Sequence, residues 1–274
     1  FVVIDEIRAF LDLFYALLVG TGVGFRVLPD DTKKLPKINA EINIANKPYH
    51  GKSQDNRIED TQVYKDENSV YIIIGDSKES WVNALKQYFH YLQQEDIETM
   101  IFNYDSVRPE GEILKTFGGR ASGHDAIKTM FKNIHKIIKE RKKESKMIKL
   151  RPIDCMDICN IIAQIVVVGG VRRSSQVCLF DKDDREILNS KIDLYKEGSK
   201  NYGKFWRSMS NNSILFNEKP SKEFILDILE RVKTSFEPGI VNWQGMKKRR
   251  PNVQGINPCF TGDMNLLTKF GYIP

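Results

Sequence analysis

The sequence predicts an α/β protein with buried parallel strands, because helical segments alternate with short, almost wholly apolar segments along the chain. The helical segments repeat apolar residues every three or four positions, and glycine-rich turns separate several elements. The chain has 274 residues, of which 41% are hydrophobic and 28% charged, a composition typical of a globular protein with a large core.

The first part of the chain alternates regular and irregular segments. Apolar spacing from Ile7 onward predicts a helix that ends at the glycines of residues 20–24, which also permit close backbone approach. Residues 29–70 are polar and contain prolines, so we expect an excursion without core strands. A short strand at 70–75 and a helix at 81–94, capped by Ser80, follow.

The second part begins with a loop-rich segment, residues 106–123, and continues with helices at about 125–143 and 152–168. Apolar strands are expected at 177–180, 213–216 and 240–243, with an amphipathic helix at 222–234. No internal repeat is present, and no apolar stretch has the length that a membrane span requires.

Charge and cysteine content narrow the class of protein. Two basic runs, residues 139–149 and 247–250, carry most of the net charge of +6; they predict solvated surfaces or, alternatively, attraction of polyanions such as triphosphates. Four cysteines are too few for a secreted disulfide framework and favour a cytoplasmic location. Cys155, Cys159 and Cys178 are expected to be buried packing groups rather than metal ligands.

Three motifs have residue types that can hold a ligand or a reactive group. In Asn257-Pro258-Cys259, proline restricts the backbone and suits a thiol held at a loop tip. Two glycine–arginine segments, residues 118–123 and 169–175, combine exposed backbone N–H groups with guanidinium and hydroxyl donors, which is chemistry suited to phosphate. Taken singly, each motif is also compatible with an ordinary turn or loop.

Six motifs follow one another along the chain: GTGVGF, SVRPEGEILKTFGGRASG, VVVGGVRRSSQ, SNNSI, FEPGIVN and INPC. Their order resembles that of the adenosylcobalamin-dependent ribonucleoside-triphosphate reductases, which are monomeric class II ribonucleotide reductases. The resemblance extends from Phe1 to Cys259 and is loose over residues 29–105.

This resemblance implies a fold and a division of the chain. The fold would be about half of a ten-stranded α/β barrel, with an inserted α-rich region that completes an effector site. Residues 1–27 would be the first barrel elements, 28–157 the insertion with the barrel-wall loop 106–123, and 158–258 further barrel elements. Because the chain starts with Phe1, we expect the natural N-terminus to lie upstream.

The resemblance also implies a thiyl-radical reduction of ribonucleoside triphosphates for DNA synthesis, with adenosylcobalamin as cofactor. Cys259 matches the radical cysteine, and Asn257 matches the asparagine that holds the substrate hydroxyl groups. The family's two reducing cysteines, which a thioredoxin-like protein regenerates, would lie before residue 1 and after residue 274. A carboxylate of the family falls at Thr261, so this segment alone is not expected to be active.

A deoxynucleotide effector would bind beside the same framework in a monomer that needs no nucleic acid or membrane. The residues that match the walls of the substrate and effector sites are Arg108, Gly118, Gly119, Arg120, Ser122, Gly169, Gly170, Arg172, Arg173, Ser174 and Asn212. No protein-ligated metal is expected.

The last segment, residues 259–274, departs from the reductase pattern and resembles the start of an intein. Cys259 would then attack the Pro258–Cys259 bond in an N-to-S acyl shift. Two other classes remain open: a non-catalytic nucleotide-binding module, and a cysteine hydrolase that would need a histidine base beside Cys259.

Overall fold

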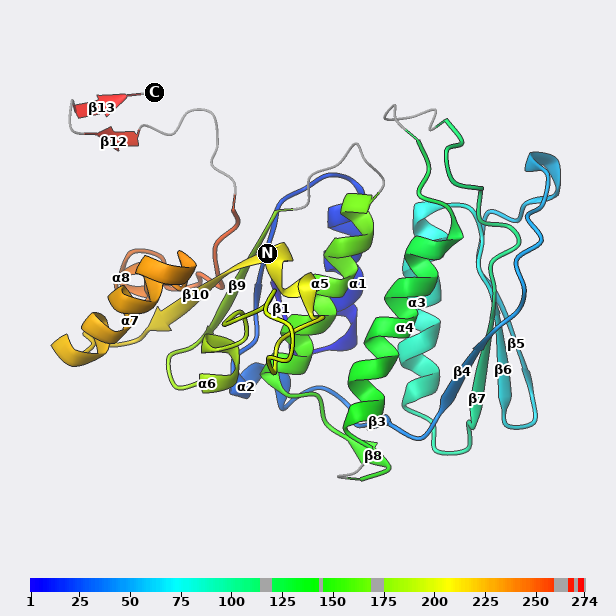
Figure 1. Cartoon of the computed structure of the whole chain (residues 1–274), viewed down its shortest axis with the longest axis horizontal. Helices are drawn as coiled ribbons and strands as arrows, with labels where there is room; N and C mark the ends of the chain where they lie inside the picture. The colour runs from blue at the N-terminus through cyan, green and yellow to red at the C-terminus, as the bar shows by residue number, and fades with distance from the viewer. Residues whose placement is uncertain (114–119, 143–144, 169–174, 259–265, 269–270, 274) are drawn as a thin grey trace.

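A five-stranded and a four-stranded β-sheet lie on either side of packed helices, and two further strand pairs are present among the described residues (Figure 1). The computed structural model describes residues 1–113, 120–142, 145–168, 175–258, 266–268 and 271–273. This arrangement confirms the predicted mixed α/β class with parallel strands.

The first sheet has five strands, all parallel to their neighbours. Their order is β1 (Val2–Val3), β2 (Val23–Arg26), β9 (Gln176–Asp181), β10 (Ser210–Phe216) and β11 (Gly239–Asn242). The last three correspond to the expected apolar strands. The sequence did not predict β1 and β2, because β1 has only two residues and β2 lies within the glycine motif.

Each face of this sheet has its own apolar cluster. On one face lie α1 (Ile7–Leu18) and α5 (Pro152–Val168), whose buried side chains belong to the main core. On the other face, Val177, Leu179, Leu215 and Trp243 form a smaller cluster. Trp243 begins α8 (Trp243–Arg249), whose exposed basic residues confirm that the run 247–250 is a solvated surface.

The remaining helices of this half are short or peripheral. They are α2 (Pro29–Thr32), α6 (Arg185–Leu188), the 3₁₀ helix η2 (Phe205–Met209) and α7 (Lys222–Ser235), the last close to the expected helix 222–234. A separate hairpin of β12 (Leu266–Thr268) and β13 (Gly271–Ile273) follows near the end of the chain.

The second sheet lies within residues 28–157, the insertion that the resemblance implies. Its order is β4 (Asn43–Asn46), β7 (Thr99–Asn103), β6 (Ser69–Ile73) and β5 (Gln62–Asp66), with only the β5–β6 pair antiparallel. A 3₁₀ helix η1 (Gln54–Asn56) and the pair β3 (Ile38–Asn39) with β8 (Met147–Ile148) complete this region. The sequence predicted no core strands at residues 29–70; β4 and β5 lie there as exposed edge strands, which need no apolar alternation and which the sequence did not reveal.

Two helices, α3 (Lys78–Leu92) and α4 (His124–Glu140), cover the inner face of the second sheet and pack against α1 and α5. The stacked rings of Phe10 and Phe89, 5.4 Å apart, join α1 to α3. Ser77 caps α3 by accepting a hydrogen bond from the Ser80 N–H (2.9 Å), so the predicted cap was placed one turn too late.

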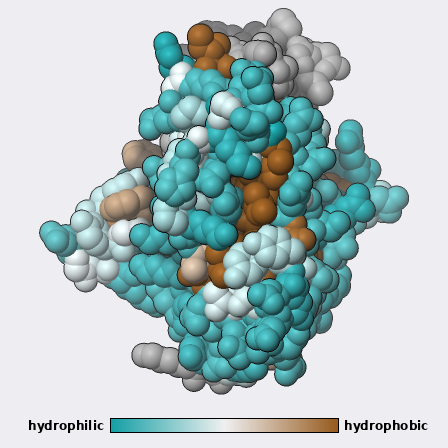
Figure 2. All heavy atoms as spheres, turned by 90° about the vertical axis from the view of Figure 1, so that its right-hand side faces the viewer, coloured by the Kyte–Doolittle hydropathy of each residue, from teal (hydrophilic) through white to brown (hydrophobic). Residues whose placement is uncertain are grey.

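The outer face of the second sheet carries an apolar strip between hydrophilic margins (Figure 2). Tyr64 and Tyr71 stack across β5 and β6 with ring centroids 4.5 Å apart. Lys47 lies over the Tyr71 ring at 5.4 Å.

A buried ion pair attaches α5 to the segment that connects β9 with β10. Arg207 donates two hydrogen bonds of 2.7 Å to the Asp157 carboxylate, and the Trp206 indole N–H donates a third. Both charged side chains are about 5% exposed, so losing either partner would leave an uncompensated buried charge.

The pH dependence of stability can be predicted from His135, which is buried in α4 with its Nδ1 3.0 Å from the Tyr88 hydroxyl. Burial, assisted by the nearby Lys139, lowers the pKa of His135 to about 4. Because the folded state keeps this imidazole neutral, the depressed pKa has no effect on stability above the unfolded value of about 6.5 and destabilises the fold progressively as pH falls toward 4. At pH 5 we expect a loss of about 2 kcal/mol relative to pH 8.

Urea unfolding of wild type and His135→Phe between pH 8 and 5 measures this contribution. The variant should show a shallower loss of unfolding free energy over this range, whereas exposed His90→Gln should follow the wild type. Equal slopes for wild type and His135→Phe would contradict the assignment.

Candidate functional site

The segment that carries Asn257 lies against the start of β2. The Gly24 N–H donates a hydrogen bond of 2.9 Å to Asn257 Oδ1. The preceding N–H, that of Val23, donates to the Ser175 carbonyl at 2.9 Å. Three motifs that are distant in the sequence therefore meet at one end of the first sheet.

The close contact between these segments requires glycine. A Cβ atom on Gly24 would lie 1.7 Å from the Ile256 carbonyl oxygen, and one on Gly255 would lie 1.8 Å from the Phe1 ring. Both distances are far shorter than any van der Waals contact, so neither position tolerates a side chain without movement of the backbone or of Phe1. This confirms the prediction that the glycines of residues 20–24 permit close backbone approach.

Asn257 is arranged so that its amide can bind a ligand. Its Oδ1 accepts from Gly24, which leaves Nδ2 pointing elsewhere, and the residue is exposed. Among the described residues, none forms a hydrogen bond with this Nδ2.

The surroundings of this segment are apolar. Val253 and Ile256 pack on the cluster that contains Trp243, which is 2% exposed. Phe1, Leu28 and Met246 border the same cluster. The sheet face beside Asn257 is therefore apolar.

Arg108 follows β7 of the second sheet, and its guanidinium group is paired with Asp76. Its backbone N–H and Nε both donate to Asp76 Oδ1 at 2.9 Å, and its Nη2 donates to the Asp76 carbonyl. Beside it, Arg57 forms a bidentate pair with Glu112 at 2.7–2.8 Å, which raises the pKa of Arg57. These ion pairs brace the base of the loop at residues 108–123.

The same loop carries Arg120 and Ser122. Arg120 is exposed, and its Nη1 donates to the Gly111 carbonyl at 2.9 Å; its backbone bridges to Ile113. Ser122 is half-buried just before α4. The structure therefore places Arg120 near Gly111 and Ile113, in the loop that begins at Arg108, and no hydrogen bond among the described residues joins this loop to Asn257.

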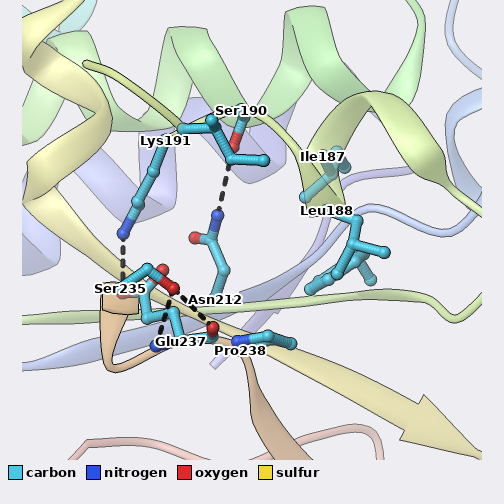
Figure 3. Close-up of a pocket in the computed structure, with 10 residues that line it drawn as sticks. Ile187, Leu188, Ser190, Lys191, Asn212, Ser235, Glu237 and Pro238 are labelled. Atoms are coloured by element: carbon cyan, nitrogen blue, oxygen red, sulfur yellow. Dashed lines mark hydrogen bonds and ion pairs between the residues drawn. The ribbon is translucent and has the colours of Figure 1, made fainter. Parts of the chain in front are cut away.

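Asn212 lies on the opposite face of the first sheet from the Asn257 segment. Its Oδ1 accepts from the Ser210 hydroxyl at 3.0 Å, and its Nδ2 lies 3.6 Å from the Met156 sulfur of α5. Figure 3 shows Asn212 in a small pocket, below Ser190 and beside Lys191 and Glu237, which form an ion pair at 2.7 Å. The side chain is 3% exposed and is held by its neighbours.

Several predicted site residues lie outside the described part of the chain. They are Gly118, Gly119, Gly169, Gly170, Arg172, Arg173, Ser174 and Cys259. Pro258, which precedes Cys259, is described and half-buried.

The other cysteines are packing groups, as the sequence predicted. Cys155, Cys159 and Cys178 are free and fully buried, and burial raises the pKa of each thiol well above its ordinary value. Thiols of this kind are poor nucleophiles because the reactive thiolate is disfavoured. Within the described ranges, no group of three or more His, Cys, Asp and Glu side chains is arranged to hold a metal ion.

The sequence did not reveal that Gly24 contacts Asn257, that Arg26 contacts Gln254, or that Trp243 packs beside this segment. The repeated glycines of GTGVGF indicated close approach but not the partner, which lies more than 200 residues away.

None of the helices in the described ranges is long and apolar enough to cross a membrane.

Comparisons with known proteins agree with this arrangement. Residues 37–138 match the family model of the B12-dependent ribonucleotide reductase insertion domain. The chain is 32% identical to the adenosylcobalamin-dependent ribonucleoside-triphosphate reductase of Lactobacillus acidophilus, over 92% of this chain and 34% of that protein. It is also 32% identical to the Euglena gracilis protein of the same name, over 93% of this chain and 31% of that protein.

A solved structure shares the fold. The crystal structure of a B12-dependent (class II) ribonucleotide reductase superposes with a TM-score of 0.65 and 25% identity, over 86% of this chain and 32% of the other. These matches show that the chain is similar to part of a ribonucleotide reductase. Within that class, the similarity is to the B12-dependent enzymes, and the chain spans about a third of the length of the curated relatives it matches.

The contact at Gly24 can be tested by Gly24→Ala. The added methyl group should displace the segment 254–258 and cost about 1–3 kcal/mol of unfolding free energy. Gly239→Ala in the same sheet is a matched control, because its Cβ would meet only the rotatable Ser213 hydroxyl, at 2.5 Å. Urea unfolding and amide hydrogen exchange should show the larger loss, and faster exchange at 253–257, for Gly24→Ala. Wild-type behaviour of this variant would contradict the contact.

Proposed function

We propose that the protein containing this chain reduces ribonucleoside triphosphates to 2′-deoxyribonucleoside triphosphates by a thiyl-radical mechanism. The observation that carries this proposal is the position of Asn257 and Pro258, held against Gly24 on an apolar sheet face immediately before Cys259. The similarity to known proteins supports it, since relatives that match over nearly the whole chain are named as ribonucleoside-triphosphate reductases.

The described residues fit a radical site. A thiyl radical needs a fixed position and apolar surroundings; the hydrogen bond between Gly24 and Asn257 and the apolar cluster around Trp243, Val253 and Ile256 support such a site. Adenosylcobalamin, when bound, supplies the organic radical that removes a hydrogen atom from the thiol. The contribution of this chain is to position the loop, and the Asn257 amide nitrogen donates a hydrogen bond to a ribose hydroxyl group.

The remaining assignments form part of the same proposal. The five parallel strands are one half of a ten-stranded barrel, and residues 28–157 are the insertion that completes an effector site. A deoxynucleotide effector contacts the segment 169–175, through Arg172 and Arg173, and the loop with Arg120 and Ser122. The enzyme acts as a cytoplasmic monomer, and a thioredoxin-like protein reduces its redox cysteines.

Cofactor dependence and Asn257 test the function together. The complete, spliced enzyme should reduce a ribonucleoside triphosphate only when adenosylcobalamin is added. Asn257→Ala should lower kcat by about 100-fold because the ribose is no longer held, whereas exposed Asn252→Ala in the same segment should retain activity.

Turnover without cobalamin, or with an iron or manganese partner subunit in its place, would contradict the radical class. Nucleotide binding without any reduction would favour the alternative of a non-catalytic nucleotide-binding module.

We also propose that the precursor undergoes protein splicing at Cys259, in which case Cys259 leaves with the intein and a cysteine at the far splice junction takes position 259 of the spliced enzyme. The sequence Cys-Phe-Thr-Gly-Asp follows Pro258 where the reductase family has a carboxylate, and a separate hairpin, β12–β13, comes next. In this reaction the Cys259 thiol attacks the Pro258 carbonyl carbon, and the peptide bond is replaced by a thioester while the amine becomes protonated.

Expression of the complete precursor tests splicing directly. Mass spectrometry should detect a ligated product from wild type and from Cys155→Ala, a control at a buried cysteine of α5. Cys259→Ala should leave only unspliced precursor. A ligated product from Cys259→Ala would exclude the intein assignment.

A further inference from the structure

Arg26, at the end of β2, connects three elements. Its Nε and Nη2 donate to the two carboxylate oxygens of Asp31 at 2.8 and 3.0 Å. Its Nη1 donates to the Gln254 backbone carbonyl at 3.0 Å. The guanidinium also lies over the Trp243 ring, with Cζ 5.9 Å from the ring centroid.

The geometry of this contact requires a guanidinium group. One edge of the planar group is occupied by Asp31, and the remaining nitrogen reaches the Gln254 carbonyl, while its face lies on Trp243. A lysine ammonium group cannot donate two parallel hydrogen bonds to one carboxylate, and it has no planar face that can lie on an aromatic ring. The side chains of Arg26 and Asp31 are only 13% and 6% exposed, so the pair is poorly screened by solvent.

Arg26 and Gly24 hold the same segment at two points. Gly24 bonds to Asn257, and Arg26 bonds to Gln254, three residues earlier in the chain. Because both come from one strand, the spacing between the two attachment points is set by β2 itself. The segment therefore has a defined direction as it approaches position 259.

We propose that Arg26 is a positioning residue for the loop that carries Asn257 and position 259, with Asp31 fixing the orientation of the guanidinium. The inference rests on the proposed function of that loop. Arg26 touches neither the substrate nor the reacting atoms in this role. It acts by holding the Gln254 carbonyl, and its loss should affect the rate of the chemical step more than substrate affinity.

The test compares Arg26→Lys with Arg207→Lys in the complete enzyme. Arg207 is a matched control, because it also forms a buried bidentate pair with an aspartate, Asp157, but contacts no part of the segment 253–258. The measurements are kcat and KM for a ribonucleoside triphosphate with adenosylcobalamin, and amide hydrogen exchange at residues 253–257. Exchange reports on the contact whether or not the enzyme turns over.

For Arg26→Lys we expect kcat to fall by about 10–100-fold and KM to change less than about threefold, with selectively faster exchange at residues 253–257. Arg207→Lys should lower the melting temperature without this selective change. If Arg26→Lys does not fold, Asp31→Asn, which keeps the size of the side chain, should show the same pattern more weakly.

Unchanged exchange at 253–257 in a folded variant would overturn the proposal, and so would faster exchange spread evenly over the first sheet. A wild-type enzyme that lacks adenosylcobalamin-dependent reduction would instead refute the proposed function. In that case the exchange measurement would still decide whether Arg26 holds the segment.

Discussion

The close approach of the segment 254–258 to β2 is the constraint on which the site depends. It exists because residue 24 has no side chain, which allows the Ile256 carbonyl to occupy the space that a Cβ atom would fill. The single hydrogen bond from Gly24 to Asn257 then fixes the side-chain amide. Because β2 pairs in parallel with β9, the central strand of the first sheet, the position of Asn257 is fixed relative to the centre of that sheet.

Helices α1 and α5 pack on the face of the first sheet opposite the Asn257 segment. They lie between the two sheets and contribute to one continuous core, so α5 is apolar on nearly every side. The buried pair of Asp157 and Arg207 ties α5 to the connection before β10. The second sheet is joined to these elements through its helices, because α3 packs against α1 and α4 packs against α5.

Strong apolar periodicity made the helices predictable, as α1, α5 and α7 illustrate, and continuous apolar runs did the same for β9 and β10. Prediction was poor where strands were short or exposed, as in β1, β4 and β5, because such strands bury few side chains. The sequence identified Asn257 through resemblance to a family. It could not reveal that Arg108 is neutralised by Asp76 or that Arg26 reaches Gln254, because both contacts depend on tertiary packing.

A crystal structure of the complete, spliced enzyme with a bound ribonucleoside triphosphate would show where the ribose lies relative to Asn257. We expect a ribose hydroxyl within about 3 Å of the Asn257 amide nitrogen, on the sheet face lined by Trp243, with the Gly24 hydrogen bond retained. A ribose bound on the opposite face, or an Asn257 side chain turned away from both Gly24 and the ligand, would contradict this expectation.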